Sequence, residues 1–489
     1  MARQNWYYYL ALLCIACAGI PKGYDEGGFS ASTKLDSFVQ DFNLQKANWE
    51  GRESELADRK ANISSFGVLG AAFGSLIAIL LNDRASMASR IWGGLGAGSL
   101  TVTAPLFLAE IATAKRRGLM VSLYMVVLLS FLTLGFFINY GASVHMSQTR
   151  EQYRLVQAIP LIPVGVAFVC SWWMDDTPRW LASQDRYDEA MAALSRLRGT
   201  ASTDPSIREE FEQIEAQRRQ KVADLAATSL KSVVKEIATV PTYRSRFLLV
   251  MTMQTVAQWS GGNGTTFYIP EIFQYAGIDG KDSSLISSGA YGIVKLVFTM
   301  VFAWGLIDII GRRRCFLTGL GLQLAAHIYM CVYMSQQPGV ASNKSASNAA
   351  IASVFIYAVG WSIGLCTVQY LYGTEVFPTR IRSVSYASSM SLHWFFQFAV
   401  VRVTPNMFQS LDVYGAYIFW SLICGGGFIL LGLWAPETKG VPMERMGELF
   451  SGHWWMGWKA KLGPEPCTAY TDEEKIAAGK AANSYVERV

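Results

Sequence analysis

Long apolar runs separated by short charged segments dominate the pattern of the chain. A helix that crosses about 30 Å of hydrocarbon at about 1.5 Å per residue needs about 20 predominantly apolar residues. Runs of this kind occur near residues 6–28, 63–82, 91–112, 119–139, 156–174, 246–270, 285–308, 315–335, 348–372, 384–403 and 415–435. The pattern predicts an all-α polytopic membrane protein with about eleven spans.

One long polar segment divides these runs into a group of five and a group of six. Lys and Arg crowd this segment and the loops that end at Arg84, Arg117, Arg314 and Arg382, which predicts a cytoplasmic location for all of them. We therefore predict four parts: an N-terminal transmembrane bundle at 1–174, a cytoplasmic helical linker at 175–245, a C-terminal transmembrane bundle at 246–449 and a cytoplasmic tail at 450–489.

Composition supports a membrane protein. Hydrophobic residues make up 51% and charged residues 16% of the 489 positions, against roughly 25% charged residues in average soluble proteins. The net charge of +5 fits basic loops beside anionic lipid and gives no reason to expect a nucleic-acid partner. The four histidines are far apart in sequence, and neither a nucleophile motif nor a metal-ligand spacing is present. We expect no enzymatic activity, no cofactor and no metal site.

A charge pattern occurs twice, 265 residues apart. Glu110 ends an apolar run and is followed seven positions later by Arg117, and Glu375 is followed in the same way by Arg382. An acidic and basic group precedes each copy: Asp83 with Arg84, and Asp308 with 312–314. A charge pattern duplicated at the ends of apolar segments is typical of transporters built from structural repeats.

The two copies are not spaced alike. From Asp308 to Glu375 there are 67 positions, enough for two spans and a loop, whereas from Asp83 to Glu110 there are 27, enough for one. The first half is therefore expected to be shorter than the second by one helix and its loop.

Several short stretches occur in one order along nearly the whole chain: GYD (23–25), RIWGGLGAGSL (90–100), PLFLAEIATAKRRG (105–118), TPRWL (177–181), QWSGGNGTTFYIPEIF (258–273), DIIGRRR (308–314), TEVFPTRIRS (374–383) and PETKG (436–440). In these stretches the chain resembles the sugar porters of the major facilitator superfamily, and within them the fungal branch that includes quinate permeases. The resemblance implies a major facilitator fold, in which two six-helix bundles surround a central site and work by alternating access. Together with the spacing above, it implies that this chain lacks the third of twelve helices.

Charged residues at the cytoplasmic ends of the helices are predicted to form a latch: Asp83, Arg84, Glu110, Arg117, Arg179, Asp308, Arg312, Arg313, Glu375, Arg382 and Glu437. Opposite charges there can pair across the two bundles, hold the outward-open state and separate when the site opens inward. The alternative is a set of ordinary surface ion pairs, each of which contributes little.

Asp25 is the candidate for proton coupling, because an ionisable residue inside a span is costly and usually functional. Arg90 begins the segment that matches the family's fourth helix, and the resemblance implies that these two positions pair. We predict proton symport; a static ion pair in a facilitator is the alternative. Lys22 and Glu26, one helical turn apart, can form a pair of their own.

Five residues are candidates for the substrate site. Gln258 and Asn263 lie in the signature of the seventh helix, and their amides suit the hydroxyls of a polyol ring because they both donate and accept. Tyr370, Trp394 and Gln397 match positions near the family's pocket, with core packing as an equal alternative for each.

The chain departs from the family where sugar porters commonly carry further amides. Ala257 precedes Gln258, Met125 stands at a Gln position, and the tenth-helix motif reads CTVQY at 366–370. Lys295 lies in mid-span and can meet a carboxylate, which favours an acidic polyol such as quinate; snorkelling or an internal ion pair is an equal alternative.

These observations predict a secondary active transporter of a sugar or of a polyol-type acid such as quinate, in the plasma membrane. Its expected partners are a small-molecule substrate, protons and the lipid bilayer. Two alternatives stay open: a transport-impaired splice or gene-model variant, and a transporter-derived nutrient sensor. The sensor is disfavoured because only about forty mostly polar residues follow position 450.

Overall fold

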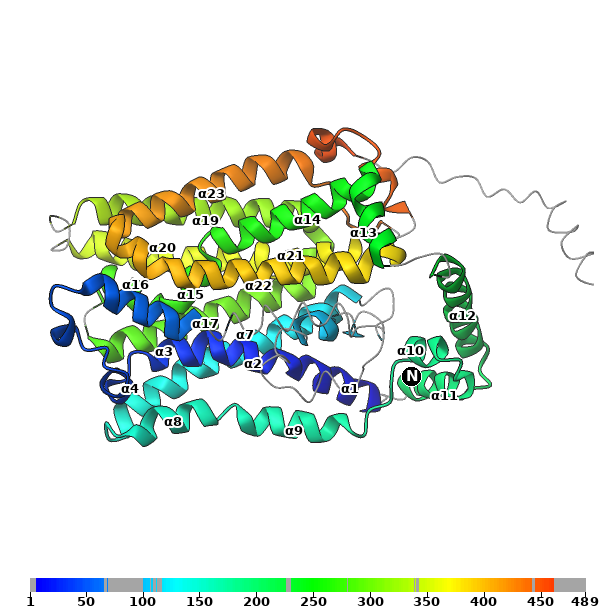
Figure 1. Ribbon diagram of the computed structural model, residues 1–489, viewed down its shortest axis with the longest axis horizontal. Coiled ribbons are helices and arrows are strands. Elements are labelled where there is room, and N and C mark those ends of the chain that lie inside the picture. The colour runs from blue at the N-terminus through cyan, green and yellow to red at the C-terminus, as the bar shows by residue number, and fades with distance from the viewer. Residues whose placement is uncertain are drawn as a thin grey trace, which may run out of the picture.

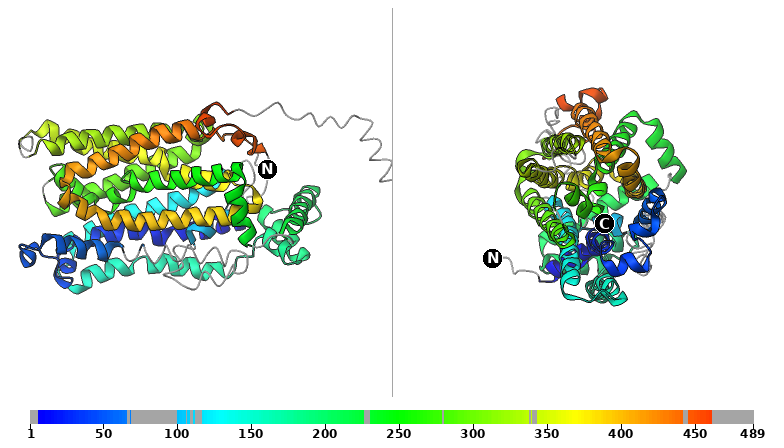
Figure 2. Two further views of the ribbon diagram at one scale, coloured as in Figure 1. Left: turned by 45° about the horizontal axis from the view of Figure 1, so that its top comes forward. Right: turned by 90° about the vertical axis from the view of Figure 1, so that its left-hand side faces the viewer.

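The computed structural model describes residues 6–65, 68, 100–105, 107–108, 111, 117–225, 230–278, 280–337, 339, 343–441 and 445–460, which are mainly helical and contain no strand. The helices form two groups side by side, an N-terminal half drawn in blue to cyan and a C-terminal half drawn in green to orange (Figure 1). The end-on view in Figure 2 shows both groups arranged around a common centre. The predicted all-α class and the two bundles are confirmed.

The N-terminal half starts with one span made of consecutive short pieces. These are α1 (Trp6–Ala16), the 3-10 turn η1 (Cys17–Gly19), α2 (Ile20–Tyr24), the π-helix η2 (Asp25–Phe29) and α3 (Ser30–Ser32). Outside the span follow α4 (Asp36–Asp41), η3 (Lys46–Trp49) and a helical stretch at 53–65. The remaining described parts of this half include helical residues at 100–105 and 107–108, then α7 (Arg117–His145), α8 (Arg150–Ala158) and α9 (Leu161–Ser171).

The polar segment after α9 folds into short helices at one end of the molecule, on the right in Figure 1. They are α10 (Pro178–Ser183), α11 (Tyr187–Arg198), α12 (Pro205–Leu225) and α13 (Leu230–Thr239). The first three share a small apolar core of their own, and Gly199, with φ of 68°, ends α11 in the left-handed conformation that glycine adopts without strain.

The C-terminal half contains the rest of the described helices. In chain order these are α14 (Pro241–Trp259), α15 (Gly262–Phe267), α16 (Ile269–Tyr275), α17 (Lys281–Val301), the π-helix η6 (Phe302–Leu306), α18 (Ile307–Ile310), α19 (Arg312–Ser335), α20 (Lys344–Ile363), α21 (Leu365–Glu375), α22 (Thr379–Ser410), α23 (Asp412–Trp434), η8 (Glu448–Phe450) and η9 (Trp454–Lys459). The halves meet along α7 and α17, where Phe137 packs on Gly289 and Thr133 on Gly292.

Hydrophobic length and exposure both fit a bilayer. Among the described residues, six helical stretches are long and apolar enough to span: Ser122–His145, Arg150–Ser171, Asp282–Gly305, Arg312–Ser335, Lys344–Glu375 and Asp412–Trp434. Large apolar side chains such as Leu161, Ile162 and Leu422 are each 70% exposed on the outside of the bundles, a surface that hydrocarbon covers. Of the predicted spans, 63–82 and 91–112 lie largely outside the described residues; the other nine fall on described helices.

The first span packs against α7 with its backbone in contact. A Cβ added to Gly23 would lie 2.0 Å from the carbonyl oxygen of Leu128, and one added to Gly27 would lie 2.1 Å from that of Leu132. Small residues four positions apart let two helix backbones approach this closely. The depth at which the first span sits against α7 therefore depends on these glycines, and so does the position of every side chain that the span directs toward the C-terminal half.

We expect Gly23→Ala to lower the unfolding temperature of the purified protein by several degrees, because the added methyl group must push two backbones apart at a cost of about 1–3 kcal/mol. Gly141→Ala is the matched control, since a Cβ at Gly141 meets no atom within 4 Å. Thermal unfolding in detergent measures the difference; equal unfolding temperatures for the two variants would contradict the packing argument.

Candidate functional site

Three helices are interrupted near the junction of the two halves. The first span forms the π-helix η2 over Asp25–Phe29. Gly261, with φ of 90°, separates α14 from α15, and Gly364 separates α20 from α21. Interrupted helices in transporters direct backbone and side-chain polar groups into the middle of the membrane, and π-turns recur at functional sites. The interruptions therefore mark the region in which to look for polar side chains.

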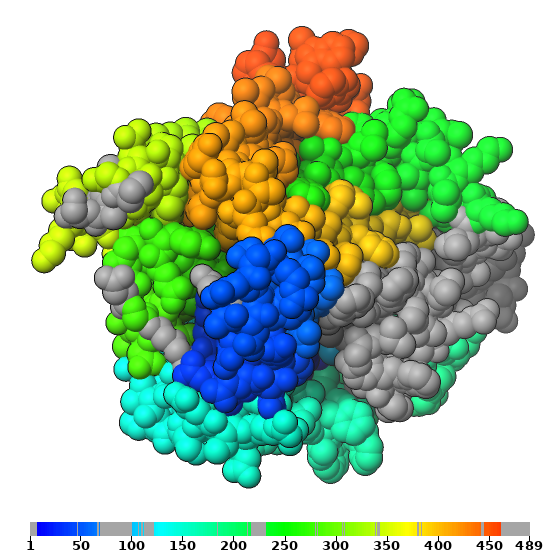
Figure 3. Space-filling view, turned by 60° about the vertical axis from the view of Figure 1, so that its left-hand side comes forward, coloured from blue at the N-terminus to red at the C-terminus, as the bar shows by residue number. Residues whose placement is uncertain are grey.

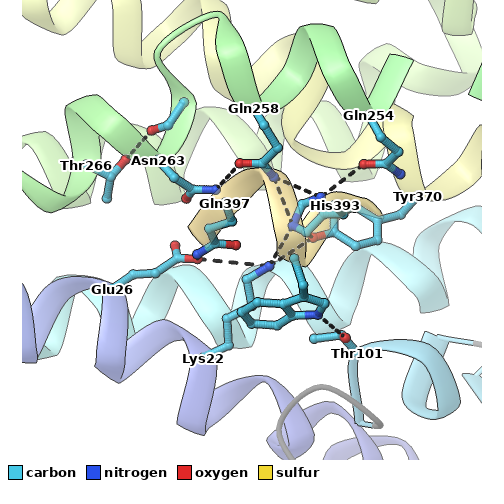
Figure 4. Close-up of polar contacts among 12 residues, drawn as sticks. Lys22, Glu26, Thr101, Gln254, Gln258, Asn263, Thr266, Tyr370, His393 and Gln397 are labelled. Atoms are coloured by element: carbon cyan, nitrogen blue, oxygen red, sulfur yellow. Dashed lines mark hydrogen bonds and ion pairs between the residues drawn. The ribbon is translucent and has the colours of Figure 1, made fainter. Parts of the chain in front are cut away.

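Eight buried polar residues meet there and form the central polar cluster (Figure 4). They are Lys22, Glu26, Gln254, Gln258, Asn263, Tyr370, His393 and Gln397. Lys22 and Glu26 come from α2 and η2 of the N-terminal half, and the others come from α14, α15, α21 and α22 of the C-terminal half. Since both halves contribute, the cluster bridges the junction.

Lys22 of the N-terminal half contacts several residues of the C-terminal half. Its ammonium donates to the hydroxyl of Tyr370 at 3.1 Å and lies 3.2 Å from Nε2 of His393. The nearest oxygen of Glu26 is 3.9 Å away, and the ring of Trp394 is 4.5 Å from the ammonium. The pair of Lys22 and Glu26 expected from the sequence is therefore present, and it faces the C-terminal half.

A chain of side-chain hydrogen bonds continues from His393 into α14 and α15. Because an ammonium only donates, Nε2 of His393 accepts from Lys22, and the ring proton lies on Nδ1, which donates to the amide oxygen of Gln254 at 2.9 Å. The amide nitrogen of Gln258 lies 3.0 Å from the same Nε2, and the amide of Asn263 donates to the oxygen of Gln258 at 2.6 Å. These contacts hold the ring of His393 in one orientation.

Four of the five predicted substrate residues belong to the central polar cluster, and the fifth adjoins it. Gln397 donates to Glu26 at 3.2 Å, and the indole of Trp394 donates to Thr101 of the N-terminal half at 2.9 Å. Lys295, the sixth candidate, is buried in the C-terminal half, where its ammonium donates to Thr266 at 3.1 Å near the rings of Tyr291 and Trp361.

Asp25 and Glu26 are adjacent in sequence but differ in surroundings. The side chain of Asp25 is exposed, whereas that of Glu26 is buried in the central polar cluster. Arg90, the expected partner of Asp25, lies outside the described residues. The predicted pairing of Asp25 with Arg90 stays a prediction.

Several members of the predicted latch lie in the C-terminal half and contact one another there. Arg312 forms an ion pair with Glu375 at 3.3 Å, and both oxygens of Glu437 accept from the backbone N–H groups of Arg312 and Arg313 at the start of α19. Arg382 donates to the carbonyl oxygen of Phe377 at 3.1 Å. These contacts lie within one half, where Glu437 also complements the positive end of the α19 dipole.

The remaining members of the predicted latch belong to the N-terminal half, the linker and α18. Asp83, Arg84 and Glu110 lie outside the described residues, as do the side chains of Arg117 and Asp308. Arg179 lies in the first turn of α10 and is partly buried. Pairing across the two bundles at this end therefore stays a prediction.

At the opposite end of the bundles, ion pairs do cross from one half to the other. Lys34 binds Glu271 of α16 at 2.8 Å, and Asp58 binds Arg402 of α22 at 2.9 Å. Figure 3 shows the blue segment after the first span lying against the orange end of α22. A hydrogen bond from Asn406, together with Arg402, holds the pKa of Asp58 below its usual range, so this carboxylate stays charged. The halves are thus joined at the end of the bundles opposite Glu375 and Glu437.

Comparison with known proteins agrees with this architecture. Residues 85–450 match the family described as sugar (and other) transporters. The chain belongs to that family. This transporter is 28% identical to the quinate permease of Neurospora africana, over 92% of this chain and 90% of the permease, and 26% identical to that of Emericella nidulans, over 91% and 89%. These relatives are permeases, and the prediction that the chain is a transporter and not an enzyme is confirmed.

Solved structures confirm the fold. The Escherichia coli proton:xylose symporter XylE of the major facilitator superfamily superimposes with a TM-score of 0.70, at 19% identity, over 92% of this chain and all of XylE. Together with the family match and the six long apolar helices, this fold makes the transporter a multi-pass membrane protein.

The alignment with the permease also bears on length. It extends over 492 positions, whereas 92% of the 489 residues of this transporter is about 450 residues. About 40 positions of the permease therefore have no counterpart here, roughly the length of one span with a loop.

Two residues of the central polar cluster were not predicted from the sequence. Gln254 lies four positions before Gln258, so the two share one face of α14, which was a usable signal. His393 is an ionisable residue within a predicted span and by that criterion a candidate. Its sequence distance from the other histidines carried no information about the side chains that it contacts.

We expect Glu375→Gln to slow uptake about fivefold or more, because losing about 1 kcal/mol from a contact that controls the transport cycle changes a rate by that factor. Glu189→Gln is the matched control, since Glu189 pairs with Arg186 on the surface of the linker, where such pairs contribute little. Initial rates of labelled substrate uptake distinguish a latch from ordinary ion pairs. The same rate in both variants would contradict the latch hypothesis.

Proposed function

We propose that this transporter is a secondary active carrier of a sugar or a polyol-type acid, and that it works by alternating access and proton symport in the plasma membrane. The observation that supports this best is the central polar cluster, which is buried at the junction and contains residues of both halves. Binding groups shared between two bundles can be exposed to one side at a time when the bundles rock.

The contacts at the two ends support the same mechanism. On the non-cytoplasmic side, Lys34 with Glu271 and Asp58 with Arg402 join the halves. Opening toward that side requires these pairs to separate. The cytoplasmic charges around Glu375 are proposed to re-form across the bundles in that state, so that one end closes as the other opens.

Asp25 with Arg90 is proposed as the proton-coupling pair. Asp25 lies inside the first span and directly precedes Glu26 of the central polar cluster; an ionisable group inside a span is costly unless it serves the transport cycle. The structural relative XylE is described as a proton:xylose symporter, which is consistent with coupling here.

Asp25→Asn should abolish accumulation of substrate against its gradient while leaving exchange of substrate across the membrane, because the carboxylate that carries the proton is gone. Uptake at an imposed pH gradient, with and without a protonophore, measures accumulation, and counterflow measures exchange. Asp188→Asn, a change in the linker, is the control. Unchanged accumulation in Asp25→Asn would show that coupling does not use this residue.

A polyol-type acid is the substrate that we favour. Relatives in two fungal genera are named quinate permeases, and the central polar cluster combines amides, which suit hydroxyl groups, with a buried ammonium, which suits a carboxylate. Lys295 stays a second candidate for the carboxylate, although its ammonium already has Thr266 as a partner.

A second proposal is that this chain is a transport-impaired variant that lacks the third helix. It rests on the 27 positions between Asp83 and Glu110, against 67 between Asp308 and Glu375, and on the roughly 40 permease positions without a counterpart.

Sequencing the genomic DNA around codons 84–90 tests this proposal. We expect an in-frame stretch that encodes about 30 further, largely apolar residues, because a helix that crosses the bilayer and its loop need that length. An uninterrupted reading frame with no such stretch, together with normal uptake by the chain, would refute it.

A further inference from the structure

The pairing of Lys22 with Glu26 is incomplete in a specific way. The ammonium nitrogen of Lys22 lies 3.9 Å from the nearest carboxylate oxygen of Glu26, whereas these two atoms are about 2.7–2.9 Å apart in a direct contact. Glu26 lies closer to the amide of Gln397, at 3.2 Å. Among the described residues, the ammonium thus has a counter-ion nearby but no carboxylate oxygen in direct contact.

The direct contacts of Lys22 are neutral. They are the hydroxyl of Tyr370, Nε2 of His393 and the face of the Trp394 ring. A buried ammonium that is only partly neutralised attracts an anion strongly, because the low dielectric that makes the charge costly also strengthens its pairing.

Both halves carry unused hydrogen-bonding groups next to members of the central polar cluster. The amide nitrogen of Gln254 and the hydroxyl of Tyr124 are buried and have no hydrogen-bond partner among the described residues. Gln254 holds His393, and Tyr124 neighbours Tyr370 and Glu26. Unpartnered buried polar groups cost free energy, and a ligand that carries hydroxyl groups can satisfy them.

We propose that Lys22 binds the carboxylate of a hydroxylated monocarboxylic acid directly, and that Glu26 is the internal counter-ion whose place this carboxylate takes. The inference rests on the proposed transport function and assigns its carboxylate-binding residue. The substrate's hydroxyl groups bind the amides of the central polar cluster. A neutral polyol offers no group that replaces Glu26 beside Lys22, so the site selects the acid.

The proposal requires the two residues to act in opposite directions. Removing Lys22 removes the partner of the substrate carboxylate, so the affinity for the acid falls. Removing the charge of Glu26 removes the competitor for the same ammonium, so the affinity rises. General damage to the fold cannot produce both changes.

The test measures binding of quinate, as the acidic probe, and of myo-inositol, as the neutral cyclic polyol, to the purified full-length chain in detergent. Isothermal titration gives the dissociation constants, and thermal unfolding with and without probe checks them. We expect Lys22→Met to weaken quinate binding at least tenfold and Glu26→Gln to tighten it several-fold. Lys344→Met, which removes an exposed lysine, should match the unmodified protein.

Two further variants protect the test from misfolding. Lys22→Met with Glu26→Gln removes both charges and leaves none unpaired, and it should still bind quinate at least tenfold more weakly than the unmodified protein. Lys22→Arg keeps a cationic group that can bind the carboxylate of quinate, so it should bind quinate more tightly than Lys22→Met does. Equal quinate binding with and without Lys22, a loss of binding in Lys295→Met in place of Lys22→Met, or a preference for myo-inositol would each overturn the proposal.

Uptake into proteoliposomes separates this inference from the proposed function. Binding of quinate that depends on Lys22, without any uptake, would overturn transport by this chain and leave the carboxylate site in place. Uptake of neutral sugars by a protein that does not bind quinate would leave transport in place and overturn the carboxylate site.

Discussion

A buried ammonium between two helical bundles has to be neutralised and hydrogen-bonded where it lies. Lys22 meets this constraint with groups from both sides: Glu26 on its own helix, and Tyr370 and His393 from the other half. Water cannot compensate the charge in the closed junction. The same contacts therefore hold the two halves together, and any opening of the junction has to replace them with water or with substrate.

The backbone is irregular beside the central polar cluster. The π-helix η2, the positive φ of Gly261 and the break at Gly364 each interrupt a helix beside the central polar cluster. Such interruptions are tolerated in a membrane only where protein or a polar cavity satisfies the freed groups. The close approach of Gly23 and Gly27 to α7 provides the rigid support on one side.

The two ends of the bundles differ in the contacts that the structure describes. At the end of the bundles near α4 and α16, charges pair from one half to the other, through Asp58 with Arg402 and Lys34 with Glu271. At the other end, Arg312 pairs with Glu375, and the backbone at the start of α19 binds Glu437, both within the C-terminal half. Separating the halves near α4 and α16 therefore requires these two ion pairs to break.

Much of the fold follows from the sequence, because the thickness of a bilayer fixes the length of an apolar run and the basic loops fix its orientation. The spans from 119 onward, the linker helices and the family motifs could all be recognised locally. Gln258 and Asn263 could be predicted as candidate substrate residues because they lie in one contiguous motif, which is also recognised locally.

The side chains that meet at the junction were decided only by tertiary packing. Neighbouring residues on a helix point about 100° apart, so sequence could not tell whether Asp25 or Glu26 faces the C-terminal half; the packing of Gly23 and Gly27 on α7 turns Glu26 inward. Likewise, 371 residues separate Lys22 from His393 in the chain. The sequence by itself determined that this is a helical transporter with charge in its first span; only the packing of one bundle on the other decided which charge meets which partner, because a contact between distant segments depends on the faces that both helices present.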